Sequence, residues 1–196
     1  MIHKVEKTIG GRTLSIESGR IGRQAAGSVL VQYAETSVFC AVTIAPPREG
    51  LDFFPLTVDY REKTSAAGKI PGGFFKREGR PTTKEILTCR MIDRPVRPLF
   101  PKEFQMDTFI ALMVVSADGQ NDPDILAMIA ASAALSISEA PFLGPTGSVR
   151  IGLVDDEFVV NPSTEECKTS KLDLVVSGTR DSVTMVECGA NEVAED

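Results

Sequence analysis

The sequence predicts an α/β (α+β) domain in which a mixed sheet packs on two main helices. Short β-branched and aromatic runs recur along the 196 residues, and they outnumber the helical segments. Two segments carry helix-start motifs, and a long glycine-rich stretch separates the early strands from the first helix. A chain of this length buries roughly 70% of its unfolded surface, which is enough for one hydrophobic core.

The composition is that of an ordinary folded protein. Hydrophobic residues make up 42% and charged residues 24% of the chain, which excludes a disordered segment. The first seven residues contain no apolar run of signal-peptide length, and the longest apolar-rich stretch, 125–137, is too short to span a bilayer. We therefore expect a cytoplasmic protein that does not associate with membranes.

The cysteines predict no disulfide framework and no zinc site. Four cysteines lie far apart, without a Cys-x-x-Cys pair, and the single histidine is His3. We expect reduced thiols that pack as small hydrophobic side chains.

The N-terminal third predicts antiparallel strands. Residues 2–8 and 13–17 alternate around Gly10-Gly11, which favours a hairpin turn. Two β-branched runs, 29–33 and 37–44, follow across a short gap, and 54–60 is similar. The expected arrangement is a meander.

A long loop and a capped helix come next. Residues 61–80 contain four glycines and one proline without a steady period, which predicts a loop. Thr82 and Glu85 have the spacing of a capping box at the start of a helix. Pro95 and Pro98 are predicted to end that helix. Because residues before proline avoid the α region, the arginines that precede them, Arg94 and Arg97, are expected in an extended tail.

The second half predicts one buried strand, one helix and a set of closing strands. The apolar run 109–115 is typical of a central strand buried on both faces. Asp122 is placed to cap a helix whose first turn contains Pro123, and its small residues indicate close packing. Further strands are predicted at 149–154 and 158–160, joined by Asp155-Asp156, and at 172–176 and 183–186.

The net charge of −6 is unevenly distributed. Residues 69–102 hold nine Lys or Arg against three acids, a local charge of +6 that leaves −12 on the remainder. Within this segment, two phenylalanines stand beside cations in the sequence Gly-Gly-Phe-Phe-Lys-Arg-Glu-Gly-Arg, residues 72–80.

This pattern suits single-stranded RNA. Bases stack on exposed aromatic rings at about 1–3 kcal/mol each, while cations meet phosphates regardless of base sequence. The candidate RNA-binding residues are Phe74, Phe75, Lys76, Arg77 and Arg80. The alternative, in which the rings are buried anchors and the charges are merely solvated, stays open at this point.

A second basic cluster follows in residues 90–101. Arg90, Arg94 and Arg97 surround one carboxylate, Asp93. Guanidinium groups bind phosphate through two hydrogen bonds, so these arginines are candidates to face phosphate. Equally, Asp93 can tie one or two of them into a salt-bridged corner at a helix or subunit interface.

Familiar catalytic sets are missing from the sequence. It contains no Gly-x-Ser-x-Gly, no Gly-x-x-x-x-Gly-Lys and no histidine suited to a triad. Five acids are candidate ligands for a divalent metal, but roles in turns and helix caps explain each of them: Asp118, Asp122, Asp124, Asp155 and Asp156. We predict no metal site and no catalytic residue in this segment.

Three motifs resemble the first half of the bacterial polynucleotide phosphorylases (polyribonucleotide nucleotidyltransferases): Gly-Gly-Phe-Phe-Lys-Arg-Glu-Gly-Arg-Pro, Arg-x-x-Asp-Arg-Pro-x-Arg-Pro-Leu-Phe-Pro and Ser-Ala-Asp-Gly-Gln-Asn-Asp-Pro-Asp. The resemblance runs from Gly11-Arg12 and residues 19–25 to residues 183–187. It implies that residues 1–190 form a first ribonuclease-PH-like domain, related to the ribosomal-protein-S5-like fold. Residues 191–196 would begin the linker to the helical and second ribonuclease-PH-like domains.

The same resemblance implies a function. Members of the family form trimeric rings and carry C-terminal KH and S1 RNA-binding domains. They degrade mRNA by processive 3′-to-5′ phosphorolysis, using inorganic phosphate and Mg²⁺ or Mn²⁺ and releasing nucleoside diphosphates. This chemistry belongs to the second domain, so no cofactor is expected here. The implied partners are single-stranded RNA, other copies in a homotrimer of the full-length protein and RNA-degradosome components, but not DNA.

The sequence departs from the catalytic copy at three places. Thr83-Lys84 stands where that copy has Arg-Arg, and Gly-Gln-Asn-Asp at 119–122 replaces Gly-Ser-Ser-Ser. The catalytic copy also carries an Asp-x5-Asp-x-Lys set. The corresponding residues here are Cys167, Asp173 and Val175, so only the central acid remains. The first two changes remove a phosphate fork and add a carboxylate that repels phosphate.

The resemblance therefore implies a segment that guides RNA through the pore and builds the trimer without degrading RNA. In the family, the Phe-Phe-basic loop lines the central pore of the ring and grips RNA there. Lys76 replaces an arginine that many members have, which keeps the charge and loses the planar fork. Two alternatives remain: the domain is itself phosphorolytic, or it only builds the ring.

Overall fold

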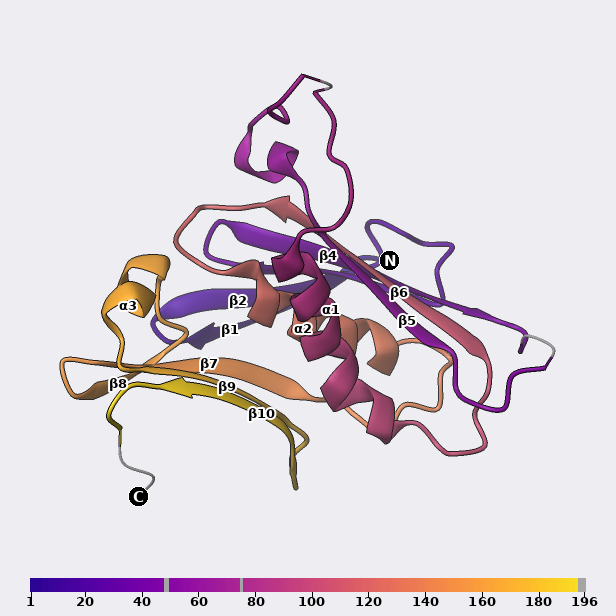
Figure 1. Cartoon of the computed structure of the whole chain (residues 1–196). Coiled ribbons are helices and arrows are strands. Elements are labelled where there is room, and N and C mark those ends of the chain that lie inside the picture. Colours follow the sequence, from indigo (N-terminus) through magenta and orange to yellow (C-terminus); the bar gives the residue numbers. More distant parts are fainter. Residues whose placement is uncertain (48–49, 75, 194–196) are drawn as a thin grey trace.

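Two sheets enclose the two main helices of this protein (Figure 1). The computed structural model describes residues 1–47, 50–74 and 76–193. The larger sheet has the strand order β1-β2-β3-β4-β6-β5, and the smaller one has the order β10-β9-β7-β8. The α/β class with a mixed sheet is thus confirmed, but the predicted strands divide between two sheets because the helices bury apolar side chains on both sides.

Four antiparallel strands begin the larger sheet. They are β1 (His3–Ile9), β2 (Arg12–Ser18), β3 (Gly27–Tyr33) and β4 (Thr36–Ala45). The predicted hairpin is confirmed at Gly10 and Gly11, whose φ angles of 55° and 75° suit glycine in a tight turn.

The next strand, β5 (Leu56–Glu62), does not continue the predicted meander. It pairs in parallel with β6 (Asp107–Ser116), and β6 lies between β4 and β5. A parallel pair needs a crossover connection, which the helix between the two strands provides. The meander prediction was wrong because strand order depends on this crossover rather than on the local pattern.

The strand β6 is central but buried on one face only. Ile110, Leu112 and Val114 point into the core, whereas Met113 and Val115 are 43% and 45% exposed. The prediction of burial on both faces was wrong because the helices cover only one face of this sheet (Figure 1).

The helix α1 (Thr83–Val96) begins as predicted and ends later. Thr82 and Glu85 form the capping box. Pro95 lies inside the helix, and a 3-10 turn, η2 (Arg97–Leu99), follows it directly. Arg94 and Arg97 are therefore helical rather than extended. Proline removes one hydrogen bond, but Arg97 still donates its backbone N–H to Asp93, and Pro95 is buried in the packed interior.

The helix α2 (Pro123–Ser136) forms the centre of the core. Asp122 caps it, and most of its side chains are buried between the sheets. Strand β3 packs so closely that a Cβ added to Gly27 would lie 2.2 Å from the carbonyl oxygen of Ala134. The small residues predicted to allow close packing do so here.

The smaller sheet closes the fold. It consists of β7 (Gly147–Val154), β8 (Glu157–Val160), β9 (Leu172–Gly178) and β10 (Val183–Ala190), with a short helix, α3 (Thr164–Thr169), before β9. These strands match the predicted ones and are antiparallel. No helix in the described ranges is long and apolar enough to cross a membrane.

Candidate functional site

A loop that projects from one end of the larger sheet carries the aromatic and basic residues (Figure 1). It follows β5 and a 3-10 turn, η1 (Thr64–Ala67), and it leads into α1. The ring of Phe74 is 94% exposed, and Lys76, Arg77 and Arg80 are exposed as well. Phe75 lies outside the described residues. Among the described residues, none forms an ion pair with these three cations.

The second basic cluster has two kinds of arginine. Arg90 is exposed on α1, and Nη1 of Arg94 lies 3.3 Å from a carboxylate oxygen of Glu187 on β10. Arg97 is held in place: it donates to both oxygens of Asp93 at 2.8 and 2.7 Å and to two backbone carbonyls before and within β5. The guanidinium of Arg97 therefore fixes the C-terminal end of α1 against β5.

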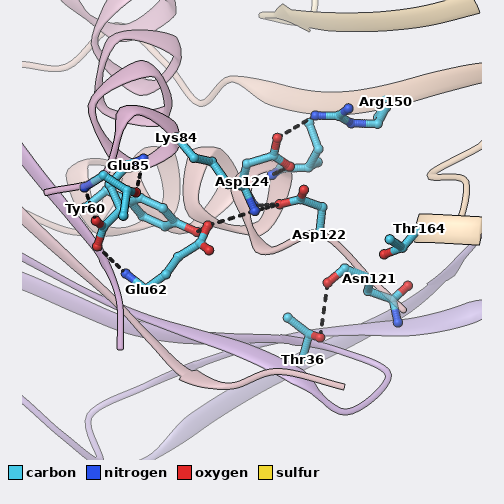
Figure 2. Close-up of polar contacts among 12 residues, drawn as sticks. Thr36, Tyr60, Glu62, Lys84, Glu85, Asn121, Asp122, Asp124, Arg150 and Thr164 are labelled. Atoms are coloured by element: carbon cyan, nitrogen blue, oxygen red, sulfur yellow. Dashed lines mark hydrogen bonds and ion pairs between the residues drawn. The ribbon is translucent and has the colours of Figure 1, made fainter. Parts of the chain in front are cut away.

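A cleft lies beside the starts of α1 and α2. Figure 2 shows the polar contacts of residues in and near it. Its cavity of about 340 Å³ is bounded by the end of β5, η1, the end of β6, the start of α1 and the turn before α2. Nζ of Lys84 bridges Glu62 and Asp122, at 3.0 and 3.1 Å. Burial by itself would lower the pKa of Lys84, but these two carboxylates outweigh it and raise that pKa. Lys84 is thus a fully paired cation.

A second ion-pair cluster lies deeper and joins α2 to the smaller sheet. Nη2 of Arg150 on β7 lies 2.5 Å from Oδ2 of Asp124, and its Nη1 lies 2.9 Å from Oδ1 of Asp173 on β9. Burial of Asp124, together with the neighbouring Asp122 carboxylate, raises the pKa of Asp124 to about 6. Two cations and four carboxylates therefore line this end of the helices.

This electrostatic pattern disfavours a bound phosphate. A helix N-terminus attracts anions through its free N–H groups and its dipole. Here carboxylates of the chain already occupy these positions, because Glu85 accepts from Thr82 N at 2.6 Å and Asp122 accepts from Asp124 N at 3.3 Å. A phosphate would have to displace them.

The other acids named as metal candidates serve turns. Asp118 accepts from the backbone N–H groups of Gln120 and Asn121, each at 2.8 Å, and these bonds outweigh burial and lower its pKa. Asp155 and Asp156 form the turn between β7 and β8 with positive φ angles. Over the described ranges, no three His, Cys, Asp or Glu side chains are grouped to hold a metal ion.

The three positions compared with the catalytic acid–lysine set do not form a metal or acid site. Val175 is buried in β9, Asp173 pairs with Arg150, and Sγ of Cys167 lies 3.8 Å from the carbonyl oxygen of Pro162. A valine offers no ligand atom, so these residues do not fit the divalent metal of the catalytic copy. All cysteines are free.

Sequence reasoning missed two residues that organise these sites. Arg150 is the centre of the buried cluster, and Glu78 holds the projecting loop to Thr64 of η1. Glu78 was detectable in the sequence as the one carboxylate within a run of cations. Nothing in the sequence around Arg150 indicates that it pairs with an acid of α2.

Comparison with known proteins assigns the family. The model described as "3′ exoribonuclease family, domain 1" matches residues 10–141. The chain belongs to the 3′ exoribonuclease family. The model for domain 2 of the same 3′ exoribonuclease family matches residues 144–196, most of which form the smaller sheet.

Relatives in the 3′ exoribonuclease family agree with the resemblance found in the motifs. The chain is 55% identical over 196 residues to the polyribonucleotide nucleotidyltransferase of Xanthobacter autotrophicus and 57% identical over 195 residues to that of Nitrobacter winogradskyi. These alignments cover 100% and 99% of this chain but only 27% of each relative. The chain thus spans about a quarter of the length of these relatives.

Solved structures confirm the fold of the 3′ exoribonuclease family. A chain of the Archaeoglobus fulgidus exosome with RNA bound to the active site superposes with a TM-score of 0.69 at 19% identity, covering 100% of this chain and 80% of that one. Rice (Oryza sativa) Rrp46 gives a TM-score of 0.71 at 15% identity, covering 98% and 82%. At such identities the likeness concerns the fold alone.

Proposed function

We propose that this chain is the N-terminal, non-catalytic ribonuclease-PH-like part of a polynucleotide phosphorylase, and that it guides single-stranded RNA through the pore of the ring. The observation that carries the proposal is a contrast in charge pairing. Lys84 in the cleft and Arg150 in the deeper cluster are both paired with carboxylates, whereas Lys76, Arg77 and Arg80 are exposed on the projecting loop.

The paired cleft supports the absence of phosphorolysis in this segment. Phosphorolysis requires inorganic phosphate to be held beside the RNA by cations and hydrogen-bond donors. In this cleft, Asp122 and Glu62 take up the charge of Lys84, and in the deeper cluster Asp124 takes up that of Arg150. Among the described residues, both cations that line the cleft, Lys63 and Lys84, are thus paired with carboxylates of the chain rather than free for phosphate.

The exposed loop supports the guiding role. A flat ring that is 94% exposed offers a stacking surface to any base, and cations nearby hold the phosphates without regard to sequence. Phe74, Phe75, Lys76 and Arg77 would grip the strand, with Arg80 at the edge. Arg90 and Arg94 are exposed and belong to the proposed interface, as phosphate contacts or as contacts to another copy. Arg97 contributes to this interface only by fixing the C-terminal end of α1 against β5.

The full-length protein is proposed to work as a cytoplasmic homotrimer in mRNA degradation and RNA processing. Its second ribonuclease-PH-like domain would hold inorganic phosphate and Mg²⁺ or Mn²⁺ and release nucleoside diphosphates. The trimer places several weakly binding loops around one strand, so avidity would raise the affinity for RNA. RNA-degradosome components are further proposed partners.

The test measures RNA binding and phosphate-dependent degradation by this chain. We expect salt-sensitive binding to a single-stranded RNA, with affinity lowered at least about thirtyfold by Phe74→Ala together with Phe75→Ala, because two stacking contacts of about 1 kcal/mol or more each are lost. Arg77→Ala should lower it less. No nucleoside diphosphate should be released at any phosphate concentration. Release by the unaltered chain would show that the domain is itself phosphorolytic, and unchanged affinity in the double variant would show a purely structural role.

A further inference from the structure

The projecting loop contains one carboxylate, whose negative charge lies among the cations proposed to bind RNA. Glu78 stands between Arg77 and Arg80 in the segment proposed to meet RNA phosphates. An unpaired carboxylate there would repel the strand and weaken binding. The structure shows instead that this carboxylate is turned back toward the sheet.

Glu78 is bound at both of its oxygens. Oε1 accepts from the backbone N–H of Thr64 at 2.5 Å and from the hydroxyl of Thr64 at 2.9 Å. Oε2 lies 3.0 Å from Nζ of Lys63. The backbone N–H of Thr64 in particular, with help from Lys63, lowers the pKa of Glu78. The charge of Glu78 is therefore satisfied within the chain.

These contacts supply a cap that η1 lacks. Its preceding residue, Lys63, provides no side-chain hydrogen bond to the first turn, and Glu78 fills that role from fourteen positions further along the chain. The turn is fixed to the sheet, because Ala117 at the end of β6 donates its N–H to Ala66 at 3.0 Å. Glu78 is thus linked to the body of the domain through η1.

Both ends of the loop meet at one residue. The backbone N–H of Lys69 donates to the carbonyl oxygen of Thr64 at 3.1 Å, and Glu78 accepts from the N–H of the same residue. The first and last residues of the segment 69–78 are therefore both hydrogen-bonded to Thr64, and Phe74 lies between them in the chain. Closing the loop in this way limits the conformations that its aromatic and basic side chains can adopt.

We propose that Glu78 is a positioning residue for RNA: it closes the loop of residues 69–78 on Thr64, which presents Phe74 and the neighbouring cations to the strand and turns its own charge away from phosphate. The proposal rests on the proposed RNA-guiding function. It predicts the opposite sign from simple electrostatics, in which removal of a carboxylate from a basic loop strengthens RNA binding.

The experiment measures RNA affinity and trypsin cleavage for Glu78→Ala and Glu78→Gln. We expect Glu78→Ala to lower the affinity about fivefold, because an open loop must be ordered again on binding. Glu78→Gln keeps an acceptor for Thr64 and should show a smaller loss. Trypsin should cleave after Lys69, which lies nine positions before the substituted residue, several times faster in Glu78→Ala, at an unchanged Tm. The matched control is Glu165→Ala, an exposed carboxylate on α3 that should change neither measurement.

The outcomes separate this proposal from the function on which it rests. If Phe74→Ala lowers RNA affinity while Glu78→Ala leaves it unchanged or raises it, the guiding function stands and the positioning role is wrong. If Phe74→Ala has no effect, the guiding function itself fails. In a double variant, Glu78→Ala should add little to Phe74→Ala, because both act through the same loop; full additivity would overturn the positioning role.

Discussion

Single side chains at the starts of α1 and α2 decide which ion the cleft can accept. Both helices point their free N–H groups toward it, an arrangement that favours an anion. Glu85 and Asp122 supply that negative charge from the chain itself, and Lys84 is balanced by Glu62 and Asp122. Exchange of one such carboxylate for an amide changes the charge of the cleft and retains the shape of the side chain.

Asp122→Asn should give the cleft a measurable affinity for phosphate. Asparagine caps a helix about as well as aspartate, so α2 should keep its start, while Lys84 would retain only Glu62 as a partner. We expect inorganic phosphate to raise the Tm of this variant more than that of the unaltered chain at equal ionic strength. Asp173→Asn is the control, because it removes one carboxylate away from Lys84. An equal response in both variants would indicate a general charge effect.

Glu85→Ala should destabilise the domain by about 2 kcal/mol, because two backbone N–H groups lose their acceptor. Glu85 accepts from Thr82 at 2.6 Å and from Glu62 at 2.9 Å, which ties the start of α1 to the end of β5. Urea unfolding measures the loss. A change well below 1 kcal/mol would mean that water replaces the lost bonds.

The contribution of Glu85 should also depend on pH. Burial of Glu85 opposes its ionisation, but the hydrogen bonds from Thr82 and Glu62 outweigh burial and lower its pKa below the ordinary value of 4.5. A lowered carboxyl pKa stabilises the folded state above the unfolded pKa and loses this contribution as pH falls through the folded value. The difference in unfolding free energy between the unaltered chain and Glu85→Gln should therefore shrink below about pH 4.5. A constant difference from pH 7 to pH 3 would contradict this.

At the scale of elements, the sequence correctly predicts features that depend on neighbouring residues, and it fails where contacts between distant segments determine the strand order. The Gly10-Gly11 hairpin, the capping box at Thr82 and the Asp122 cap depend on neighbouring residues, and all three are present. The parallel pairing of β5 with β6 and the division into two sheets depend on contacts across the fold. Pro95 illustrates the difference: its local preference to end a helix yields to burial against the core.

Close packing of β3 on α2 makes Gly27 sensitive to a single added methyl group. The Cβ of an alanine there would lie 2.2 Å from the carbonyl oxygen of Ala134, so strand or helix must move. We expect Gly27→Ala to lower the free energy of unfolding by about 3 kcal/mol. Gly147→Ala is the matched control, since this glycine also begins a strand but has nothing within 4 Å of an added Cβ. Similar unfolding curves for the two variants would contradict the close contact.

At the scale of the whole molecule, charge is separated along the chain. The segment 69–102 carries +6 while the remainder carries −12, and the basic loop projects from one end of the larger sheet, away from the smaller sheet (Figure 1). The sequence located this loop. It left open which charged side chains face solvent. Arg97 donates to the carbonyl oxygen of Leu56 and Glu78 accepts from Thr64, so the position of each depends on a contact between segments that are far apart in the chain.

This separation predicts salt-dependent RNA binding despite the net negative charge. Each cation that neutralises a phosphate of a single strand contributes about −0.7 to the slope of log affinity against log salt, so Lys76, Arg77 and Arg80 together contribute about −2. Replacing Lys76, Arg77 and Arg80 together by alanine should reduce the magnitude of the slope by about 2. The control replaces Lys168 and Lys171, which pair with acids in and near the smaller sheet, and should keep the slope. If the loop variant retained the slope and the control lost it, RNA would bind near the smaller sheet, through Lys168 and Lys171 rather than through the projecting loop.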